Sequence, residues 1–446
     1  MRIIIAGAGD VGFHLAKLLA YENQDIVLID TDSDKLKYIA NQLDVATIQG
    51  TATSYSVLED AGIHKADLLI SATSSEETNL TVAIIGKHLG ARRTVARISN
   101  VEYLLQRDKL DLARLGIDEI ISPASLAAKE IQRLLKDSAL TDTFDFDKGM
   151  LSLVGVRIDE HCELHGRSMI DLAELNPDQN FVTVAILRNN QTLIPYGKSI
   201  FETGDHAYFI TQPEGINRIL ELSGQVKVEI KDIMILGGSK VGQNAIRRLS
   251  QRYNVKVVEK DKDRCFELAD QFPEALVING DGRDVDLLKS EGLQEMDAFV
   301  AVTGNSETNI ISCLVAKNHG VKKTISLVEN MDYIHLSQSI GVDTMINKKL
   351  IAANFIFRYI RKGSVLSITS IHGVDAEILE FEVKPTSKIA DQELQEVDFP
   401  HTAIIGGVIR NGRGYTAMGD FVFQAKDRVV VLAMPECIHK VEAFFK

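Results

Sequence analysis

Three glycines near the start of the chain have the spacing of a nucleotide-binding turn. Gly7, Gly9 and Gly12 form the pattern G-x-G-x-x-G directly after an apolar run at residues 3–5, and a helical pattern follows them. In this context Gly7 makes the turn, Gly9 lets a phosphate approach the backbone, and Gly12 lets the helix pack closely on the strand. The sequence therefore predicts that a phosphate binds to the free N–H groups at the start of the helix.

An acidic residue lies where the ribose of such a ligand would be bound. Asp30 closes the next apolar strand, 18 residues after Gly12, near the roughly 20 residues expected for this role. A carboxylate accepts hydrogen bonds from a ribose diol and repels a 2′-phosphate, so NAD(H) or an adenine nucleotide is favoured over NADP. The alternative is a tight strand-to-helix turn that holds no ligand.

The elements around this turn alternate between strand and helix, as in a parallel sheet. The strands expected after Asp30 are residues 46–49, 66–73 and 93–98, and the helices are residues 33–42, 55–61 and 75–91. Ligands of open parallel sheets bind outside the carboxyl ends of the strands, where Thr51, Thr73, Ser74 and Arg97 lie. Arg97 would contact a phosphate or form a structural ion pair, and its position alone favours neither.

The composition excludes several classes of protein. The chain has 446 residues, an apolar fraction of 45%, and 49 basic against 62 acidic side chains, for a net charge of −13. The length predicts about three domains. The sequence shows no sustained basic face, which argues against a nucleic-acid partner, because phosphate neutralisation needs clustered lysine and arginine. No apolar segment approaches the roughly 18 residues of a membrane span, and we expect no signal peptide before the first core strand.

The cysteines offer neither a zinc site nor a disulfide framework. Cys162, Cys265, Cys313 and Cys437 are scattered, with no C-x-x-C pattern and no histidine at ligand spacing. This usage predicts buried, reduced thiols in a cytoplasmic protein.

The chain changes character after its first parallel region, and then the whole plan recurs. A turn is expected at Pro123, before a helix at residues 126–136, and residues 145–212 are rich in short strands, as in a small α+β lobe. The glycine turn recurs at residues 237–242 and the acidic strand end recurs at Glu259, while residues 425–433 repeat residues 203–211. The offset stays at about 230 residues, which indicates tandem duplication of a two-lobe unit.

The two copies differ at the predicted site. Ser239 takes the place of Gly9, and Leu327 takes the place of Arg97. A side chain at position 239 would crowd a pyrophosphate, and the leucine at position 327 removes a possible phosphate partner. Lys240, near the start of the helix, would offset these losses, although an exposed lysine is the commoner explanation. We expect the second lobe to bind a nucleotide more weakly than the first, or to bind a different one.

This organisation resembles the RCK or KTN domains, which regulate potassium conductance. The resemblance rests on GAGDVG, LID, QGTAT, SAT and ARI in the first lobe and on the GDxxxxI ending of the small lobe, and it covers nearly the whole chain. It implies an α/β fold with two Rossmann-like, doubly wound parallel-sheet lobes, each followed by a small α+β lobe. It also implies a cytoplasmic homotetramer whose Rossmann lobes form a ring beneath a membrane potassium channel of the TrkH or TrkG type. Exchange of NAD(H) and ATP or ADP would then change channel opening.

The resemblance also implies the site residues. In the first site they are Gly7, Ala8, Gly9, Asp10, Val11 and Gly12 around the phosphates, Asp30 on the ribose, and Thr51, Thr73, Ser74 and Arg97 along the strand edge. In the second site they are Gly238, Ser239, Lys240 and Val241 at the phosphates and Glu259 at the ribose. No catalytic residue and no metal ligand is predicted.

The repeat predicts six segments. They are a Rossmann lobe at residues 1–124, a crossover helix at 125–142, a small lobe at 143–227, a second Rossmann lobe at 230–348, a second crossover helix at 349–365 and a second small lobe at 366–446. The apolar stripes near residues 126–135 and 350–360 either join lobes or subunits or pack in ordinary cores, since periodicity does not choose between these roles.

Two other functions stay open at this point. An NAD-dependent oxidoreductase would need an acid or base beside the nicotinamide, and none of the small-lobe histidines, which are His161, His165, His206, His372 and His401, recurs in the other copy. Asp391, Glu393, Glu396 and Asp398 would suit a hard cation, although a solvated acidic loop is commoner.

Overall fold

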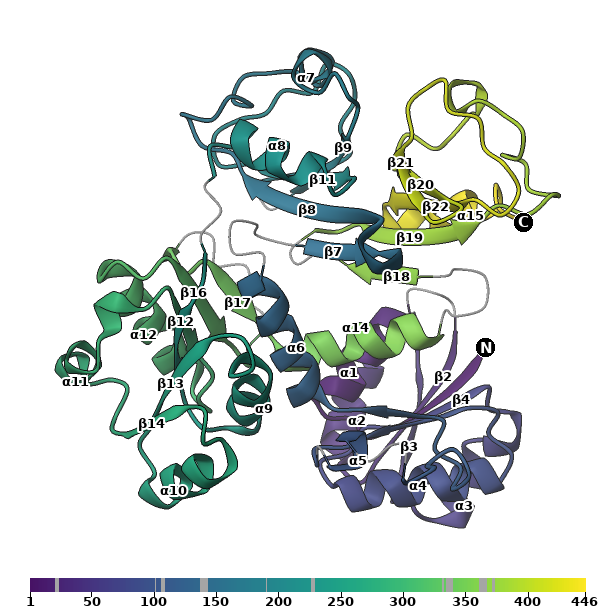
Figure 1. The fold of residues 1–446 in the computed structure, drawn as a ribbon. Helices are drawn as coiled ribbons and strands as arrows, with labels where there is room; N and C mark the ends of the chain where they lie inside the picture. The colour runs from purple at the N-terminus through teal and green to yellow at the C-terminus, as the bar shows by residue number, and fades with distance from the viewer. Residues whose placement is uncertain are drawn as a thin grey trace. The chain divides into compact units, whose positions relative to one another are not determined.

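The computed structural model describes residues 1–20, 24–100, 102–105, 109–136, 143–189, 191–225, 229–330, 333, 340–360, 367–370 and 374–446 (Figure 1). The chain forms two compact units, each built from both halves of the sequence. Unit 1 comprises Met1–Gln132, Asp232–Ile334 and Met345–Ile360. Unit 2 comprises Arg133–Lys231, His335–Thr344 and Arg361–Lys446.

Unit 1 contains two six-stranded parallel sheets, one from each copy of the repeat. The first has the order β3-β2-β1-β4-β5-β6 and the second the order β14-β13-β12-β15-β16-β17. The strands of the first are β1 (Arg2–Ala6), β2 (Asp25–Asp30), β3 (Ala46–Gln49), β4 (Leu68–Ser71), β5 (Thr94–Arg97) and β6 (Glu119–Ile121). Those of the second are β12 (Asp232–Leu236), β13 (Asn254–Glu259), β14 (Leu276–Asn279), β15 (Ala298–Ala301), β16 (Lys323–Leu327) and β17 (Thr344–Ile346). The prediction of two doubly wound parallel-sheet lobes is confirmed.

Helices connect these strands and cover the sheets. In the first copy they are α1 (Asp10–Ala20), α2 (Ser33–Ala40), α3 (Tyr55–Asp60), α4 (Glu76–His88), α5 (Glu102–Leu105) and α6 (Pro123–Lys136). In the second they are α9 (Lys240–Leu249), α10 (Lys262–Gln271), α11 (Val285–Ser290), α12 (Ser306–Asn318) and α14 (Lys348–Ile360). The central strands are buried continuously, as in β1, where Ile3, Ile4 and Ile5 have no exposed surface. Such runs are expected where helices cover both faces of a parallel sheet.

The predicted turn at Pro123 is wrong in detail, because this proline is the first residue of α6. Proline suits the first helical position, since its fixed φ is helical and the N–H it lacks would have no intrahelical partner. The helix expected at residues 126–136 therefore begins three residues earlier than predicted.

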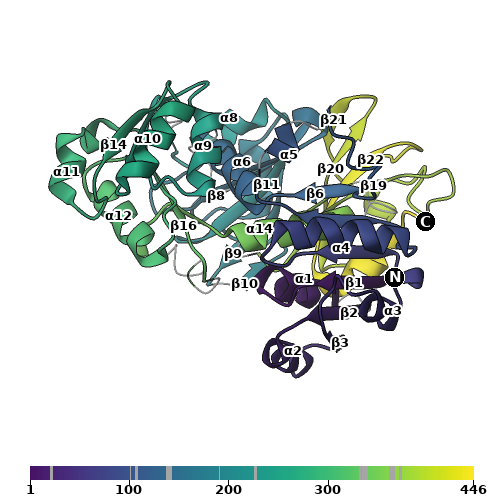
Figure 2. The same cartoon turned by 90° about the horizontal axis from the view of Figure 1, so that it is seen from below.

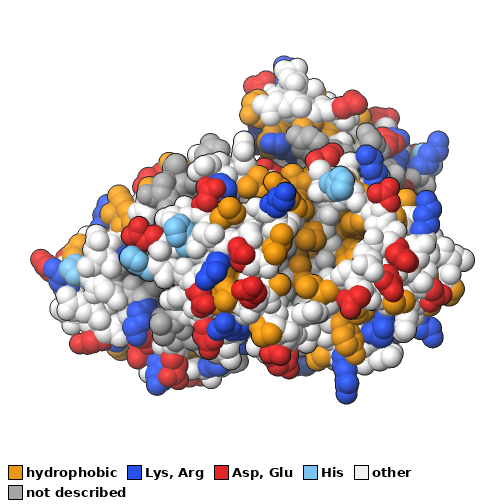
Figure 3. All heavy atoms as spheres, turned by 90° about the horizontal axis from the view of Figure 1, so that it is seen from above, with side chains coloured by type: hydrophobic (Ala, Val, Ile, Leu, Met, Phe, Trp, Pro, Cys, Tyr) orange, Lys and Arg blue, Asp and Glu red, His pale blue; other side chains and the backbone are white. Residues whose placement is uncertain are grey.

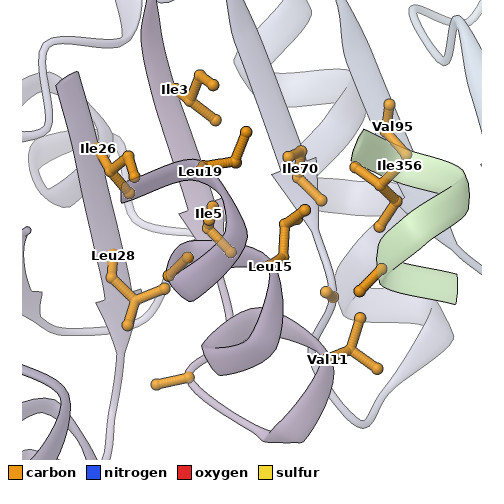
Figure 4. Packing of buried hydrophobic residues seen from close by; sticks show 14 of the residues in the cluster. Ile3, Ile5, Val11, Leu15, Leu19, Ile26, Leu28, Ile70, Val95 and Ile356 are labelled. Atoms are coloured by element: carbon orange, nitrogen blue, oxygen red, sulfur yellow. The ribbon is translucent and has the colours of Figure 1, made fainter. Parts of the chain in front are cut away.

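The helix α14 completes the core of the first lobe although it belongs to the second half of the chain. Its residues Ala352, Ala353 and Ile356 are buried in one cluster with Val11 and Leu15 of α1. Figure 4 shows Ile356 beside Val95 and close to these α1 side chains, and Figures 1 and 2 both place α14 next to α1. The apolar stripe near residues 350–360 thus joins the two halves within unit 1.

Unit 2 contains two five-stranded antiparallel sheets, with the orders β10-β9-β11-β8-β7 and β18-β19-β22-β20-β21. The elements of the first are β7 (Thr143–Phe146), β8 (Leu151–Arg157), α7 (Met169–Leu175), β9 (Phe181–Arg188), β10 (Gln191–Leu193), β11 (His206–Thr211) and α8 (Gly215–Leu222). Those of the second are β18 (Ser367–Ser370), β19 (Glu377–Glu382), β20 (Ala403–Arg410), β21 (Arg413–Thr416), β22 (Arg428–Ala433) and α15 (Ile438–Glu442). These are the two small α+β lobes that the sequence predicts.

The two small lobes share a core inside unit 2. Leu151, Val184 and Ile210 of the first sheet lie in one buried cluster with Ile378 and Val430 of the second. The two copies of the repeat therefore pack against each other in both units, through α14 in unit 1 and sheet to sheet in unit 2.

The cysteines are buried as the sequence predicts, and the surface carries charges of both signs. All four cysteines are buried thiols, as predicted. On the face shown in Figure 3, acidic and basic side chains are interspersed.

His14 in α1 makes the stability of the protein depend on pH. Burial, helped by the charge of Lys17, lowers the pKa of His14 from 6.5 to about 4, and among the described residues Nε2 has no hydrogen-bond partner. The unfolded chain binds a proton at this histidine below pH 6.5 and the folded chain only near pH 4. We expect the free energy of unfolding to fall by about 2 to 3 kcal/mol as the pH drops from 6.5 to 4.

Denaturant titrations of the protein and of His14→Leu at several pH values measure this effect. The free energy of unfolding of the variant should depend less on pH between 6.5 and 4, because leucine does not titrate. Identical slopes for the two proteins would mean that His14 is protonated equally in both states.

Candidate functional site

A pocket of about 600 Å³ lies at the carboxyl ends of the first sheet. Its lining includes nine residues predicted from the sequence, which are Gly7, Gly9, Asp10, Val11, Asp30, Thr51, Thr73, Ser74 and Arg97. Two other predicted residues lie outside this lining. Ala8 lines an adjoining pocket of about 440 Å³, and Gly12 packs against the turn.

The three glycines of the turn meet three different steric demands. Gly7 has φ +110°, and a Cβ there would lie 2.9 Å from the backbone of Ala72 and Thr73. A Cβ on Gly12 would lie 1.9 Å from the carbonyl oxygen of Gly7. A Cβ on Gly9 would meet nothing within 4 Å, since this glycine faces the pocket. The structure thus gives the turn the geometry that phosphate approach requires.

Asp30 fixes the turn from the end of β2. Its Oδ2 accepts a hydrogen bond of 2.6 Å from the backbone N–H of Ala8, and its Oδ1 accepts one of 2.9 Å from that of Asp32. Each carboxylate oxygen has a second lone pair. Asp30 can therefore hold the turn and still accept a hydrogen bond from a hydroxyl in the pocket.

Asn79, in the first turns of α4, ties together two strand ends that carry predicted site residues. Its Oδ1 accepts a hydrogen bond of 2.7 Å from Thr73 Oγ1, and its Nδ2 donates to the carbonyl of Arg97 at 2.9 Å. Asn309 makes the matching bonds to Thr303 and Leu327 in the second lobe. Sequence reasoning gave Asn79 no role, although the sequence held a signal: EETN at residues 76–79 recurs as SETN at residues 306–309, with Asn309 in the place of Asn79.

Arg97 brings a half-buried positive charge to the pocket. Burial lowers the pKa of its guanidinium, while the carboxylates of Asp10 and Glu329 act in the opposite direction. Across the part of the chain that the structure describes, no acidic group forms an ion pair with Arg97. A partly desolvated arginine of this kind favours an anionic ligand.

Two lysines from the second half of the chain also line this pocket, and sequence reasoning missed them. Lys348 and Lys349 begin α14. Lys349 Nζ lies 2.6 Å from Asp10 Oδ2 and 2.6 Å from Glu329 Oε2, and Lys348 Nζ lies 2.6 Å from Glu329 Oε1. The only signal in the sequence is that NKK opens this helix where the first copy has SPA.

The turn of the second lobe supplies its own acceptor at the start of α9. Ser239 Oγ accepts a hydrogen bond of 3.3 Å from the N–H of Gly242 and donates one of 2.6 Å to the carbonyl of Val302. In the first lobe Gly9 has no side chain to play this part. Leu327, in the place of Arg97, is buried with 3% exposure.

Glu259 holds the second turn as Asp30 holds the first. Its Oε2 accepts a hydrogen bond of 2.7 Å from the N–H of Gly238, and its Oε1 accepts one of 2.9 Å from Asp261. The carboxylate is buried, with 9% exposure. Hydrogen bonds from its own backbone N–H and from Ser75 lower the pKa of Glu77 in the first lobe, and the charge of Lys240 adds to this lowering. The second turn is therefore built like the first, but one backbone N–H at the start of its helix already donates to the hydroxyl of Ser239.

None of the residues considered for other chemistry is among the described residues that line the pocket. No histidine is among its lining residues, and His372 lies outside the described residues. In the described part of the chain, no three His, Cys, Asp or Glu residues gather as a metal site would require, the group near Asp391 included. Among the same residues, no helix is long and apolar enough to cross a membrane.

Comparison with solved structures shows where this fold occurs. The crystal structure of the GsuK RCK domain matches with a TM-score of 0.60 and 13% identity, over 99% of this chain and 94% of that one. A structure of the GsuK channel bound to NAD matches with a TM-score of 0.60 and 13% identity, over 99% of this chain and 79% of that one. At this identity the likeness shows the fold.

Comparison with sequences shows closer relatives. The Trk system potassium uptake protein TrkA of Haemophilus influenzae is 33% identical over 453 residues, covering 100% of this chain and 99% of its own. The TrkA homolog 1 of Methanosarcina mazei is 31% identical over 455 residues, covering all of both chains. The family model for the TrkA-N domain matches residues 3–123 and 233–348, and that for the TrkA-C domain matches residues 153–224 and 378–446. The chain therefore belongs to the TrkA family, with TrkA-N and TrkA-C domains in two alternating pairs.

Proposed function

We propose that this protein is a nucleotide-binding regulatory subunit of a potassium-uptake system. Relatives that match it over their full length are named Trk system potassium uptake proteins, which supports the assignment to potassium transport. The proposed partner is a membrane potassium channel of the TrkH or TrkG type. The proposed assembly is a homotetrameric ring on the cytoplasmic face of the membrane.

The observation that carries the proposal is the pocket of the first lobe. An uncapped glycine turn, the carboxylate of Asp30 and the guanidinium of Arg97, which pairs with no acidic group among the described residues, line one space of about 600 Å³. These groups suit the phosphates and ribose of a nucleotide. Structures with this fold include GsuK bound to NAD and to ADP, which supports NAD(H) and ATP or ADP as the ligands.

The residues and segments predicted from the sequence are retained within this proposal. We assign the phosphates to residues 7–12, the ribose to Asp30, and the remaining contacts to Thr51, Thr73, Ser74 and Arg97. Glu259 and residues 238–241 would form a weaker second site, because Ser239 occupies the helix start there. The six-segment division of the chain, with crossover helices at residues 125–142 and 349–365, also remains a proposal.

The proposed mechanism is regulation without turnover. A ligand shifts a two-state assembly only by the difference between its affinities for the two states. A coupling free energy of about 1 to 3 kcal/mol, which is usual for allostery, changes the equilibrium about 5- to 150-fold. Several pockets on one ring would multiply this change.

Asp30→Ala is expected to remove nucleotide binding from the first pocket. The substitution deletes the ribose acceptor and leaves the N–H of Ala8 without its partner, so calorimetric titration with NAD, NADH, ATP and ADP should show an affinity at least about tenfold lower. In vesicles that contain a TrkH-type channel, potassium flux with the unaltered protein should respond to nucleotide. With the variant this response should be lost.

Glu259→Ala is the matched control, since it makes the same change in the second lobe. It should leave the tighter binding event intact. Equal losses in both variants would contradict a stronger first site, and an absence of binding by all four nucleotides would overturn the proposal. Steady consumption of NADH with a carbonyl substrate would favour the oxidoreductase instead.

A further inference from the structure

The first pocket contains a cationic group that the second half of the chain supplies. Lys348 and Lys349 line it, and their ammonium groups share the carboxylate of Glu329, with Lys349 also reaching Asp10 at the start of α1. The side chains of Lys349 and Lys348 are only 23% and 32% exposed. Their partner Glu329 is 37% exposed, and charges that are partly shielded from solvent interact more strongly than fully exposed pairs do.

The strand order puts Arg97 at one end of the pocket and the ribose acceptor at the other. The lysines belong to the Arg97 end, because Asp10 and Glu329, which pair with Lys349, are also the carboxylates whose charges act on Arg97. Asp30 ends β2, the glycine turn follows β1, and Arg97 ends β5, in the order β2-β1-β4-β5. At about 4.8 Å between neighbouring strands, Asp30 and Arg97 are about 14 Å apart along the edge. A chain of phosphates that starts from a ribose at Asp30 and crosses the glycine turn therefore extends toward Arg97 and Lys349.

Different nucleotides present different charges at that end. A terminal phosphate carries close to two negative charges at neutral pH. A dinucleotide has singly charged internal phosphates, followed by a neutral second ribose. Three cations, from Arg97, Lys348 and Lys349, gain more from a terminal phosphate than from a ribose.

We propose that Lys348 and Lys349 are phosphate ligands of the first pocket, which make it favour nucleotides ending in a phosphate, such as ATP and ADP, over dinucleotides. This inference rests on the function proposed above. A terminal phosphate that takes Lys349 displaces it from Asp10 and Glu329. Occupancy of the first lobe is thereby coupled to α14 and to the loop after β16, both from the second half of the chain.

Calorimetry on the full-length protein tests this, with ATP, ADP, NAD and NADH as probes. The double variant Lys348→Gln/Lys349→Gln removes both charges and keeps polar side chains of similar length. We expect ATP affinity to fall at least about tenfold, as for the loss of charge-assisted hydrogen bonds, and NAD affinity to change less than about twofold. Lys262→Gln is the control, because Lys262 is an exposed lysine that begins α10 in the second half of the chain and is not among the described residues that line the pocket.

Glu329→Gln supplies a second, opposite test. It removes the carboxylate that competes with phosphate for both lysines, while its backbone N–H keeps the bond to Ser306. ATP affinity should rise, and NAD affinity should not.

The outcomes separate this inference from the proposed function. Equal losses for ATP and NAD in the double variant, or no loss for either, would overturn the role of the lysines while nucleotide binding stands. Failure of the unaltered protein to bind any of the four probes would overturn the proposed function itself.

Discussion

Gly12→Ala is expected to destabilise the first Rossmann lobe by about 3 kcal/mol. The new Cβ would lie 1.9 Å from the carbonyl oxygen and 3.0 Å from the carbonyl carbon of Gly7, and neither is a side-chain atom that can rotate away. Helix α1 would have to move from β1, with loss of packing in the core around Leu15. Alanine is otherwise favoured over glycine inside a helix by about 1 kcal/mol, so steric exclusion and helix propensity predict opposite signs. Denaturant titration measures the difference.

Gly9→Ala is the matched control three residues away. Its Cβ would meet nothing within 4 Å, so the free energy of unfolding should change by less than about 0.5 kcal/mol. The methyl group would stand in the pocket where a phosphate approaches, and nucleotide affinity should fall at least about tenfold. Full affinity in Gly9→Ala would mean that no phosphate binds there. Unchanged stability in Gly12→Ala would mean that the turn relaxes.

Asp205→Ala is expected to destabilise unit 2 by about 3 kcal/mol. The carboxylate, with 1% exposure, receives hydrogen bonds of 2.8 Å from Arg188 Nε and Nη2 and from the N–H of Glu202. These bonds raise the pKa of Arg188. Removal of the carboxylate leaves a mostly buried guanidinium whose remaining charged partner among the described residues is Glu202. Denaturant titration of the variant against the unaltered protein gives the loss.

Glu202→Ala provides the control, because Glu202 pairs with the same arginine but is 60% exposed. Pairs of this kind contribute less than about 1 kcal/mol. The second small lobe offers an independent repeat of the test, since Asp427 holds Arg410 at 2.8 and 2.7 Å. If Asp205→Ala lowers the free energy of unfolding no more than Glu202→Ala does, the buried ion pair of Arg188 with Asp205 does not stabilise unit 2 as proposed.

The sequence alone determined the fold class, the tandem repeat and nine of the 21 described residues that line the pocket. Gly7, Gly9 and Asp30 could be found because their roles depend on backbone geometry within a strand-turn-helix unit, which is encoded over about 30 residues. The carboxyl ends of parallel strands meet at one edge, so Thr51, Thr73 and Arg97 could be placed there as well. The exchange of Gly9 for Ser239 was visible in the sequence as well, and the structure adds that Ser239 Oγ bonds to the carbonyl of Val302 and the N–H of Gly242.

Only the tertiary structure decided which distant parts meet. An apolar stripe on a helix predicts that one face is buried and does not name its partner, so the contact of α14 with α1 could not be read from residues 350–360. For the same reason Lys348 and Lys349 looked like an ordinary polar helix start, although both line the pocket of the first lobe and Lys349 pairs with Asp10, more than 300 residues earlier. The buried pairs of Arg188 with Asp205 and of Arg410 with Asp427 also form only when strands fold together. Local geometry is written in neighbouring residues, whereas the choice between competing long-range contacts depends on the packing of the whole chain.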